Sequence, residues 1–105
     1  MIHLKASQVS TWAKQHSATT PDKPVLVLDV REAWEVQTAS IANDEAVNGF
    51  QLIHMPMRSV PARYPELDRH QPIACLCHHG MRSMQVAQFL ESNGFTQVAN
   101  VQGGI

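Results

Sequence analysis

The segment Pro72-Ile73-Ala74-Cys75-Leu76-Cys77-His78-His79-Gly80-Met81-Arg82-Ser83 decides the fold class of this chain. Its first six residues form an apolar run that predicts a buried β-strand, in which the proline fits only at the first position. A polar turn containing Gly80 follows, and residues 83–93 then carry apolar side chains at helical spacing. A buried strand, a short turn and a helix in direct succession favour a parallel α/β sheet.

Strand-like and helix-like stretches alternate outward from this segment. Short apolar runs predict further strands over residues 2–4, 25–30, 50–54 and 96–101. Helix signals predict helices from an N-cap at Ser7 to about His16, over 31–37, and from Ser59 to Leu67. The expected fold class is α/β, with one domain over residues 1–105, a mostly parallel central sheet that includes 50–54 near its centre, and helices on both faces.

The composition excludes several functional classes. The chain has 105 residues, of which 44% are hydrophobic and 16% charged, and its formal net charge is −1. A balanced charge argues against nucleic-acid binding, and no apolar run approaches the roughly 20 residues that a membrane span requires. The first residues lack the apolar core of a signal peptide, so we expect a cytoplasmic protein with reduced thiols.

Cys77 combines several features of a reactive thiol. It ends the predicted strand, and ligands of parallel α/β sheets bind beyond the carboxyl ends of strands. Free amides and the dipole of the following helix favour negative charge there. Gly80 allows a sharp turn with inward-pointing N–H groups, and Arg82 adds a permanent positive charge. These features predict a lowered pKa for the Cys77 thiol, whereas Cys75 is expected to be buried core.

Three stretches of the chain point to one family. Cys77–Ser83 resembles the active-site loop of rhodanese-like sulfurtransferase domains, in which Cys, Gly, Arg and Ser or Thr fall at these spacings. Asp29–Glu35 is similar to the family's upstream Asp-x-Arg-Glu-x-x-Glu motif, and Val101–Ile105 to its Gly-Gly segment. The resemblance implies a doubly wound α/β domain and a thiosulfate sulfurtransferase-like enzyme. Its thiolate would take the outer sulfur of a donor such as thiosulfate or a persulfide and pass it on.

The resemblance also implies residue roles. Cys77 matches the catalytic nucleophile, and Arg82 matches the arginine that holds the anionic donor or the loop shape. The remaining loop residues are expected to bind substrate, mainly through backbone groups; they are His78, His79, Gly80, Met81 and Ser83. Asp29 and Arg31 are expected to brace the loop. We expect no cofactor and no metal, a small sulfane-sulfur donor, a thiol or cyanide acceptor, and a protein sulfur acceptor as a further partner.

The chain departs from the family pattern at two places. Residues 39–46 lack the glycine, histidine and proline of the family's Gly-His-Ile-Pro-Gly-Ala-like segment, so the turn before the 50–54 strand is expected to be rebuilt. The family normally continues beyond Gly104-Ile105 into a helix, so we expect that helix to be missing or truncated.

Other functions remain alternatives. Dual-specificity phosphatases and some arsenate reductases share the fold but place five residues between Cys and Arg, whereas four separate Cys77 from Arg82. The shorter loop favours sulfur over a tetrahedral phosphate. A cluster of Cys75, Cys77, His78 and His79 offers soft metal ligands, but no second pair at zinc spacing accompanies it. The chain could also act as a non-enzymatic sulfur-relay or protein-binding module.

Bulky side chains outside the loop are interpreted as packing. Trp12 is expected in the core and Trp34 near the Asp29 motif. Met81 is expected at the mouth of the pocket, and Arg58 in solvent. A disulfide between Cys75 and Cys77 is disfavoured, because residues i and i+2 of an extended strand lie roughly 6.6–6.8 Å apart, at the limit of disulfide geometry.

Overall fold

The computed structural model describes residues 1–19, 23–38 and 49–102. In these ranges the strands are β1 (Ile2–Lys5), β2 (Leu26–Asp29), β3 (Gln51–His54), β4 (Ile73–Leu76) and β5 (Val98–Gln102). The α-helices are α1 (Val9–Thr19), α2 (Ala33–Thr38), α4 (Val60–Arg63) and α5 (Met81–Ser92). Short 3-10 turns are η1 (Ala6–Gln8), η2 (Met57–Ser59) and η3 (Tyr64–Glu66). The strands and helices alternate as the sequence predicts.

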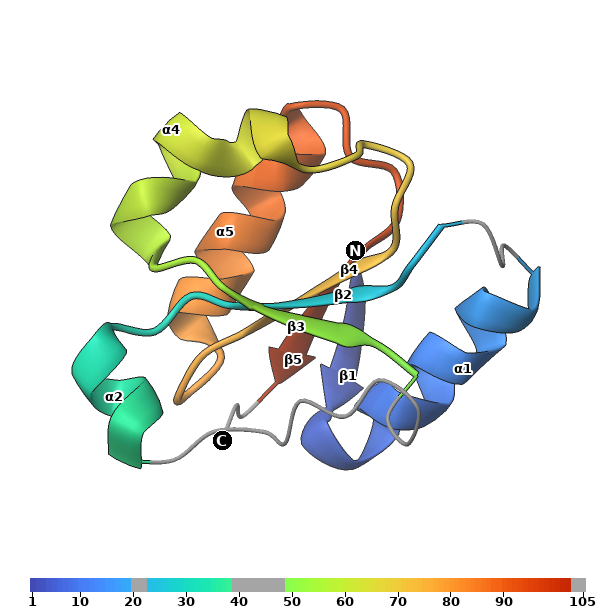
Figure 1. Ribbon diagram of the computed structural model, residues 1–105, viewed down its shortest axis with the longest axis horizontal. Helices are drawn as coiled ribbons and strands as arrows, with labels where there is room; N and C mark the ends of the chain where they lie inside the picture. Colours follow the sequence, from blue (N-terminus) through green and yellow to red (C-terminus); the bar gives the residue numbers. More distant parts are fainter. Residues whose placement is uncertain (20–22, 39–48, 103–105) are drawn as a thin grey trace.

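The five strands form one sheet in the order β1-β5-β4-β2-β3, and every neighbouring pair is parallel. Figure 1 shows α4 and α5 on one face of this sheet and α1 on the other. The predicted α/β fold with helices on both faces is therefore confirmed. Because all strands run the same way, their carboxyl ends meet at one edge of the sheet.

The apolar run of β4 reflects burial on both faces. Ile73 and Cys75 belong to the core cluster on the side of α4 and α5, while Ala74 and Leu76 belong to the cluster packed against α1. All four β4 residues are buried. A strand covered on both faces has no position for a polar side chain, which is why polar and apolar residues do not alternate in this segment.

The structure corrects the expected position of the 50–54 strand. β3 pairs only with β2 and lies at the edge of the sheet, with Gln51 and His54 exposed. Its short apolar run looked like that of a central strand because Phe50, just before it, is buried against the α1 side. Periodicity alone does not distinguish an edge strand with one covered face from a central one.

Two helix starts differ from the expected ones. Ser7 is not an N-cap: the helical path begins with η1 at Ala6, where the Lys5 backbone N–H donates to Gln8 Oε1 (2.8 Å). α5 begins at Met81, two residues earlier than its apolar spacing suggests, because Gly80 takes a left-handed φ of 88° and ends the preceding turn. The start of α5 thus lies closer to Cys77 than predicted.

The two tryptophans differ in environment. Trp12 is 7% exposed and lies in the α1-side core, as predicted. Trp34, expected to pack near the Asp29 motif, is 69% exposed and contributes little to the core. Within the described ranges, no helix has the length and apolar character needed to cross a bilayer. The expected rebuilt turn at 39–46 and the Gly-Gly segment at 103–104 lie outside the described residues.

Candidate active site

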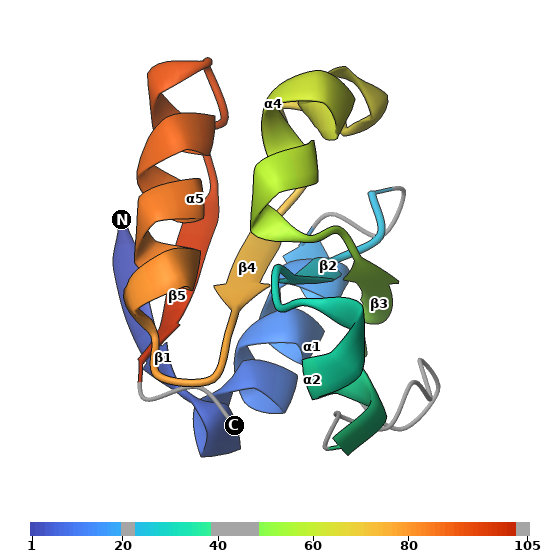
Figure 2. The same cartoon turned by 90° about the vertical axis from the view of Figure 1, so that its left-hand side faces the viewer.

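The Cys77 loop lies at the carboxyl edge of the sheet, directly after the central strand β4. β4 pairs with β5 on one side and β2 on the other, and Cys77 directly follows β4. Figure 2 shows the loop turning from the end of β4 into the start of α5, beside α2. Chain segments that are distant in sequence, from β2, α2 and β5, therefore surround one thiol.

Two backbone N–H groups donate to the Cys77 sulfur, and a hydroxyl group lies next to it. The Gly80 backbone N–H donates to Sγ at 3.0 Å, and the Ser83 backbone N–H donates to it at 3.4 Å. The Ser83 hydroxyl oxygen lies 3.4 Å from the same sulfur. Gly80 and Ser83 are themselves buried. We call Gly80 N, Ser83 N and Ser83 Oγ the sulfur cradle.

This cradle changes the acidity of the thiol. Burial alone raises the pKa of Cys77, because it disfavours the thiolate. When the thiol ionises, the Ser83 hydroxyl proton turns from Asn100 Oδ1 to the sulfur. This hydroxyl, followed by the backbone N–H groups of Ser83, Gly80 and His79, stabilises the thiolate and outweighs the effect of burial, so the pKa of Cys77 is lowered. The sulfur is thus an ionisable, nucleophilic group.

Cys75 has the opposite environment. Its side chain is 0% exposed and lies in the core cluster beneath α5. Burial, and then the nearby Cys77, raise the pKa of the Cys75 thiol to about 12. The two cysteines are both reduced, and only Cys77 has a stabilised thiolate. The predicted burial of Cys75 in the core is therefore confirmed, and the pKa of Cys77 is lowered in the expected direction.

Asn100 supports the cradle from the neighbouring strand. The Ser83 hydroxyl donates to Asn100 Oδ1 at 2.5 Å, and Asn100 Nδ2 donates to the Gly80 carbonyl at 3.3 Å. Asn100 is 2% exposed, at the middle of β5. One side chain thus fixes both the residue that caps α5 and the hydroxyl that contacts the sulfur. Asn100 was not predicted from the sequence, although a lone amide in the apolar run Val98–Val101 is a usable signal.

Arg82 is held by an acidic partner on α2. Its Nη1 and Nη2 donate to Glu35 Oε1 and Oε2 at 2.6 and 2.7 Å, which is a bidentate ion pair. The hydrogen bond with Arg82 lowers the pKa of Glu35 to about 2, against an opposing effect of burial. The guanidinium that was expected to add positive charge to the loop is therefore paired with a carboxylate. The motif that contains Glu35 did not predict this contact with Arg82.

Asp29 and Arg31 lie beneath this ion pair. Arg31 Nη2 and Asp29 Oδ2 are 2.8 Å apart, and both side chains are 2% exposed. Arg31 Nη1 also donates to the Glu35 carbonyl at 3.4 Å. The contacts run from Asp29 through Arg31 to α2, and from Glu35 to Arg82 on α5. These contacts connect Asp29 and Arg31 to the loop, and their bracing role stays a prediction.

The remaining loop side chains point outward. His78 and His79 are exposed, and their ring centroids lie 4.1 Å apart. Met81 is 67% exposed at the start of α5. Arg58 is exposed as expected and pairs with Glu32 at 3.2 Å. In the part of the chain that the structure describes, no three His, Cys, Asp or Glu side chains come together as a metal-binding group.

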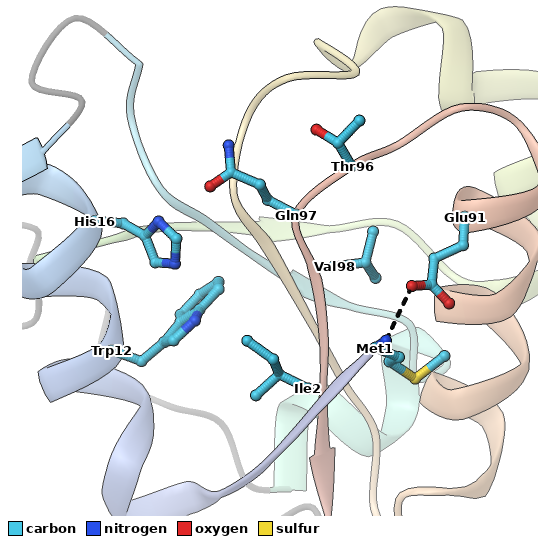
Figure 3. Close-up of a pocket in the computed structure, with 8 residues that line it drawn as sticks. All are labelled: Met1, Ile2, Trp12, His16, Glu91, Thr96, Gln97 and Val98. Atoms are coloured by element: carbon cyan, nitrogen blue, oxygen red, sulfur yellow. Dashed lines mark ion pairs between the residues drawn. The ribbon is translucent and has the colours of Figure 1, made fainter.

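A separate hollow lies at the amino ends of the parallel strands, opposite the Cys77 loop. Figure 3 shows it between α1, the end of α5 and the first residues of β1 and β5. Its lining includes Trp12 and His16, whose rings meet edge to face with centroids 4.8 Å apart. The hollow has no thiol among its lining residues, so it does not compete with Cys77 as a centre for sulfur chemistry.

Comparison with known proteins identifies the family. A model of the rhodanese-like domain matches residues 10–105. The putative sulfurtransferase YtwF of Bacillus subtilis is 31% identical over 102 residues, which cover 97% of this chain and 89% of the relative. The thiosulfate sulfurtransferase GlpE of Pseudoalteromonas translucida is 31% identical over 80 residues, covering 76% of this chain and 69% of the relative.

Structural comparison agrees with these matches. The crystal structure of a rhodanese-like domain protein from Staphylococcus aureus matches with a TM-score of 0.70 and 26% identity, covering 99% of this chain and 87% of that chain. The fold and the thiol site define an α/β domain of the rhodanese type. The chain belongs to the rhodanese-like family, as its three motifs predicted.

Proposed function

We propose that this protein is a sulfurtransferase that carries sulfane sulfur as a persulfide on Cys77. The observation that carries the proposal is the cradle of two backbone N–H groups and one hydroxyl around a thiol of lowered pKa. The names of the relatives, a putative sulfurtransferase and a thiosulfate sulfurtransferase, support the same chemistry.

The reaction has two displacement steps. The Cys77 thiolate attacks the outer sulfur of the donor, the S–S bond of the donor breaks, and sulfite leaves from thiosulfate or a thiolate leaves from a persulfide. An acceptor thiolate, or cyanide in an assay, then attacks the terminal sulfur of the Cys77 persulfide and releases the Cys77 thiolate. The sulfur atom moves with no external oxidant or reductant.

The cradle suits both anions of this cycle. The resting thiolate and the persulfide each carry one negative charge, which fixed N–H donors stabilise without a proton transfer. No general base is required, because the lowered pKa of Cys77 already favours its thiolate. We assign substrate contact to His78, His79, Gly80, Met81 and Ser83, positioning of the loop to Arg82, and support to Asp29 and Arg31.

Mass measurement of the intact protein tests the proposal. Incubation with thiosulfate or a low-molecular-weight persulfide is expected to add the mass of one sulfur atom, and cyanide is expected to remove it. Cys77→Ser should abolish the gain, whereas Cys75→Ser, which alters the buried thiol, should retain most of it. Loading of Cys77→Ser equal to that of the unmodified protein would remove the mechanism.

A sulfur-relay module is the second candidate. Cys77 is only 1% exposed, so a donor reaches its sulfur through a narrow approach. Such burial is expected to slow the reaction with free donors in solution, whereas a partner docked over the loop would deliver sulfur directly. Stoichiometric loading with very slow steady-state formation of thiocyanate would support the relay, whereas sustained turnover would support the enzyme. Absence of loading with every sulfane donor would favour a binding module.

A further inference from the structure

We infer that Glu35 is a specificity-determining residue. By pairing with Arg82, Glu35 removes the one cation of the Cys77 loop from donor binding. The site thereby selects singly charged or neutral persulfide donors over the thiosulfate dianion. This inference rests on the proposed persulfide chemistry of Cys77. It concerns the preference between donors of different charge, which the sequence motifs do not assign.

The Glu35–Arg82 pair is held in place from several directions. Arg82 Nη1 and Nη2 each donate to one Glu35 carboxylate oxygen, at 2.6 and 2.7 Å, and Glu35 Oε1 also accepts the Glu32 backbone N–H at 3.1 Å. The Glu35 side chain is 11% exposed and that of Arg82 is 36% exposed. Turning Arg82 toward a bound anion would leave a largely buried carboxylate without its partner, which is costly.

No other cation replaces Arg82 at the loop. All eight Lys and Arg residues of the chain lie in the described ranges, so each can be placed. Four of them besides Arg82 form ion pairs with carboxylates; they are Lys23, Arg31, Arg58 and Arg63.

None of the three remaining cations lies on the Cys77 loop, and Lys5 shares the carboxyl edge of the sheet with the loop but lies two strands away. Lys5 ends β1, which is separated from β4 by β5. Lys14 lies on α1, beside Gly49 and on the opposite face of the sheet from α5. Arg69 precedes β4 at the other edge, where its carbonyl accepts the Thr96 backbone N–H. The sulfur cradle therefore contains amide and hydroxyl dipoles without a free Lys or Arg.

Charge repulsion follows from this arrangement. The attacking group is a thiolate of charge −1, and its repulsion of the donor grows in proportion to the donor's charge. Thiosulfate carries two negative charges, an ionised alkyl persulfide carries one, and a protonated persulfide carries none. The start of α5 contributes only about half a positive charge, which the thiolate itself uses. The site thus accommodates one sulfur anion more readily than a dianion beside a thiolate.

The sign of the salt dependence is a test that needs no variant. The second-order rate constant for adding sulfur to Cys77 is measured by intact mass at pH 8, above the range in which imidazoles ordinarily titrate. We expect the constant for thiosulfate to rise about twofold or more as ionic strength increases from about 0.01 to 0.1 M, where the Debye length falls from about 30 to 10 Å. A constant that falls with salt would show an available cation and overturn the inference.

Removing the acidic partner gives the second test. Glu35→Gln should raise the thiosulfate constant about tenfold or more and change the constant for 2-hydroxyethyl persulfide, whose only charge is that of the persulfide, less than about threefold, because Arg82 then carries an uncompensated charge. Glu66→Gln is the matched control, because it removes the carboxylate that pairs with Arg63. Glu66 lies on η3 and Arg63 on α4. An unchanged ratio of the two donors in folded Glu35→Gln would overturn the inference.

The two proposals fail in different ways. If 2-hydroxyethyl persulfide loads Cys77 but thiosulfate constants fall with salt, only the donor inference is wrong. If neither donor loads the protein, the persulfide function is itself refuted.

Discussion

The Ser83 hydroxyl is expected to control the acidity of Cys77. Ser83 is 0% exposed, and its Oγ lies 3.4 Å from the Cys77 sulfur while donating to Asn100 at 2.5 Å. Ser83→Ala removes this hydroxyl but keeps the Ser83 and Gly80 backbone N–H groups that reach the sulfur at 3.4 and 3.0 Å. Because the hydroxyl is the largest effect that lowers the pKa of Cys77, its loss should raise that pKa.

The size of the effect follows from hydrogen-bond energies. A hydrogen bond to a charged group contributes about 1.5–3 kcal/mol, and we take the lower end because the contact to sulfur is long and the hydroxyl is shared with Asn100. One pKa unit corresponds to about 1.4 kcal/mol, so the pKa of Cys77 should rise by about one unit. Loss of the donor to buried Asn100 should also lower the free energy of unfolding by about 1–3 kcal/mol.

The assay is alkylation of the native protein by iodoacetamide over a range of pH, followed by intact mass. About one unit of pKa lowers the thiolate fraction about tenfold at pH values below the pKa, but the more basic thiolate is about threefold more nucleophilic. The observed rate at low pH should therefore fall only about threefold, and the midpoint of the profile should move upward by about one unit.

Two controls make this prediction refutable. Ser92→Ala changes an exposed serine at the far end of α5 and should leave the profile unchanged. Urea unfolding shows whether Ser83→Ala remains folded at the assay temperature. A folded Ser83→Ala protein with the original midpoint, or a lower one, would refute the assigned role of the hydroxyl.

Three further predictions concern the supports of the loop. Arg31→Met should lower the free energy of unfolding by about 3–5 kcal/mol in urea titration, because it leaves Asp29 buried without a counter-charge, and Asp29→Asn in the same chain should recover part of the loss. Gly80→Ala should cost about 1–2 kcal/mol in the same measurement and slow sulfur loading, since φ is 88° at this position; equal stability would contradict the left-handed turn. The pKa of Glu35 is lowered from 4.5 to about 2, so its pairing stabilises the fold above pH 4.5 and is lost as pH falls toward 2. With Arg82 about a third exposed, the stability difference between the unmodified protein and Glu35→Gln should be about 1 kcal/mol at pH 6 and vanish near pH 2; a difference independent of pH would contradict the assignment.

The identity of the candidate nucleophile was accessible from local sequence. A thiol at the end of an apolar run, followed by Gly80 and a helix, already implies a strand end, a tight turn and free amides. Local sequence also distinguished Cys75 from Cys77, because the residues that flank Cys75 are apolar and place it within the strand. These properties depend on residues within about one helical turn of the sulfur.

The partners of the loop were not accessible in that way. Glu35 is 47 residues from Arg82, and Asn100 is 17 residues from Ser83, so neither contact has a local signature in the spacing. The edge position of β3 likewise depends on the strand order. The exposure of Trp34 depends on the orientation of α2, which directs Glu35 toward α5.

The amino-acid sequence by itself determined the alternation of strands and helices and the place of the thiol, because burial and turn formation act over short stretches of chain. Only the tertiary structure decided the electrostatics around that thiol. The order β5-β4-β2 brings Asn100 from one side and the Asp29–Glu35 segment from the other, and charges and hydrogen bonds depend on distances in space, which a linear pattern does not contain.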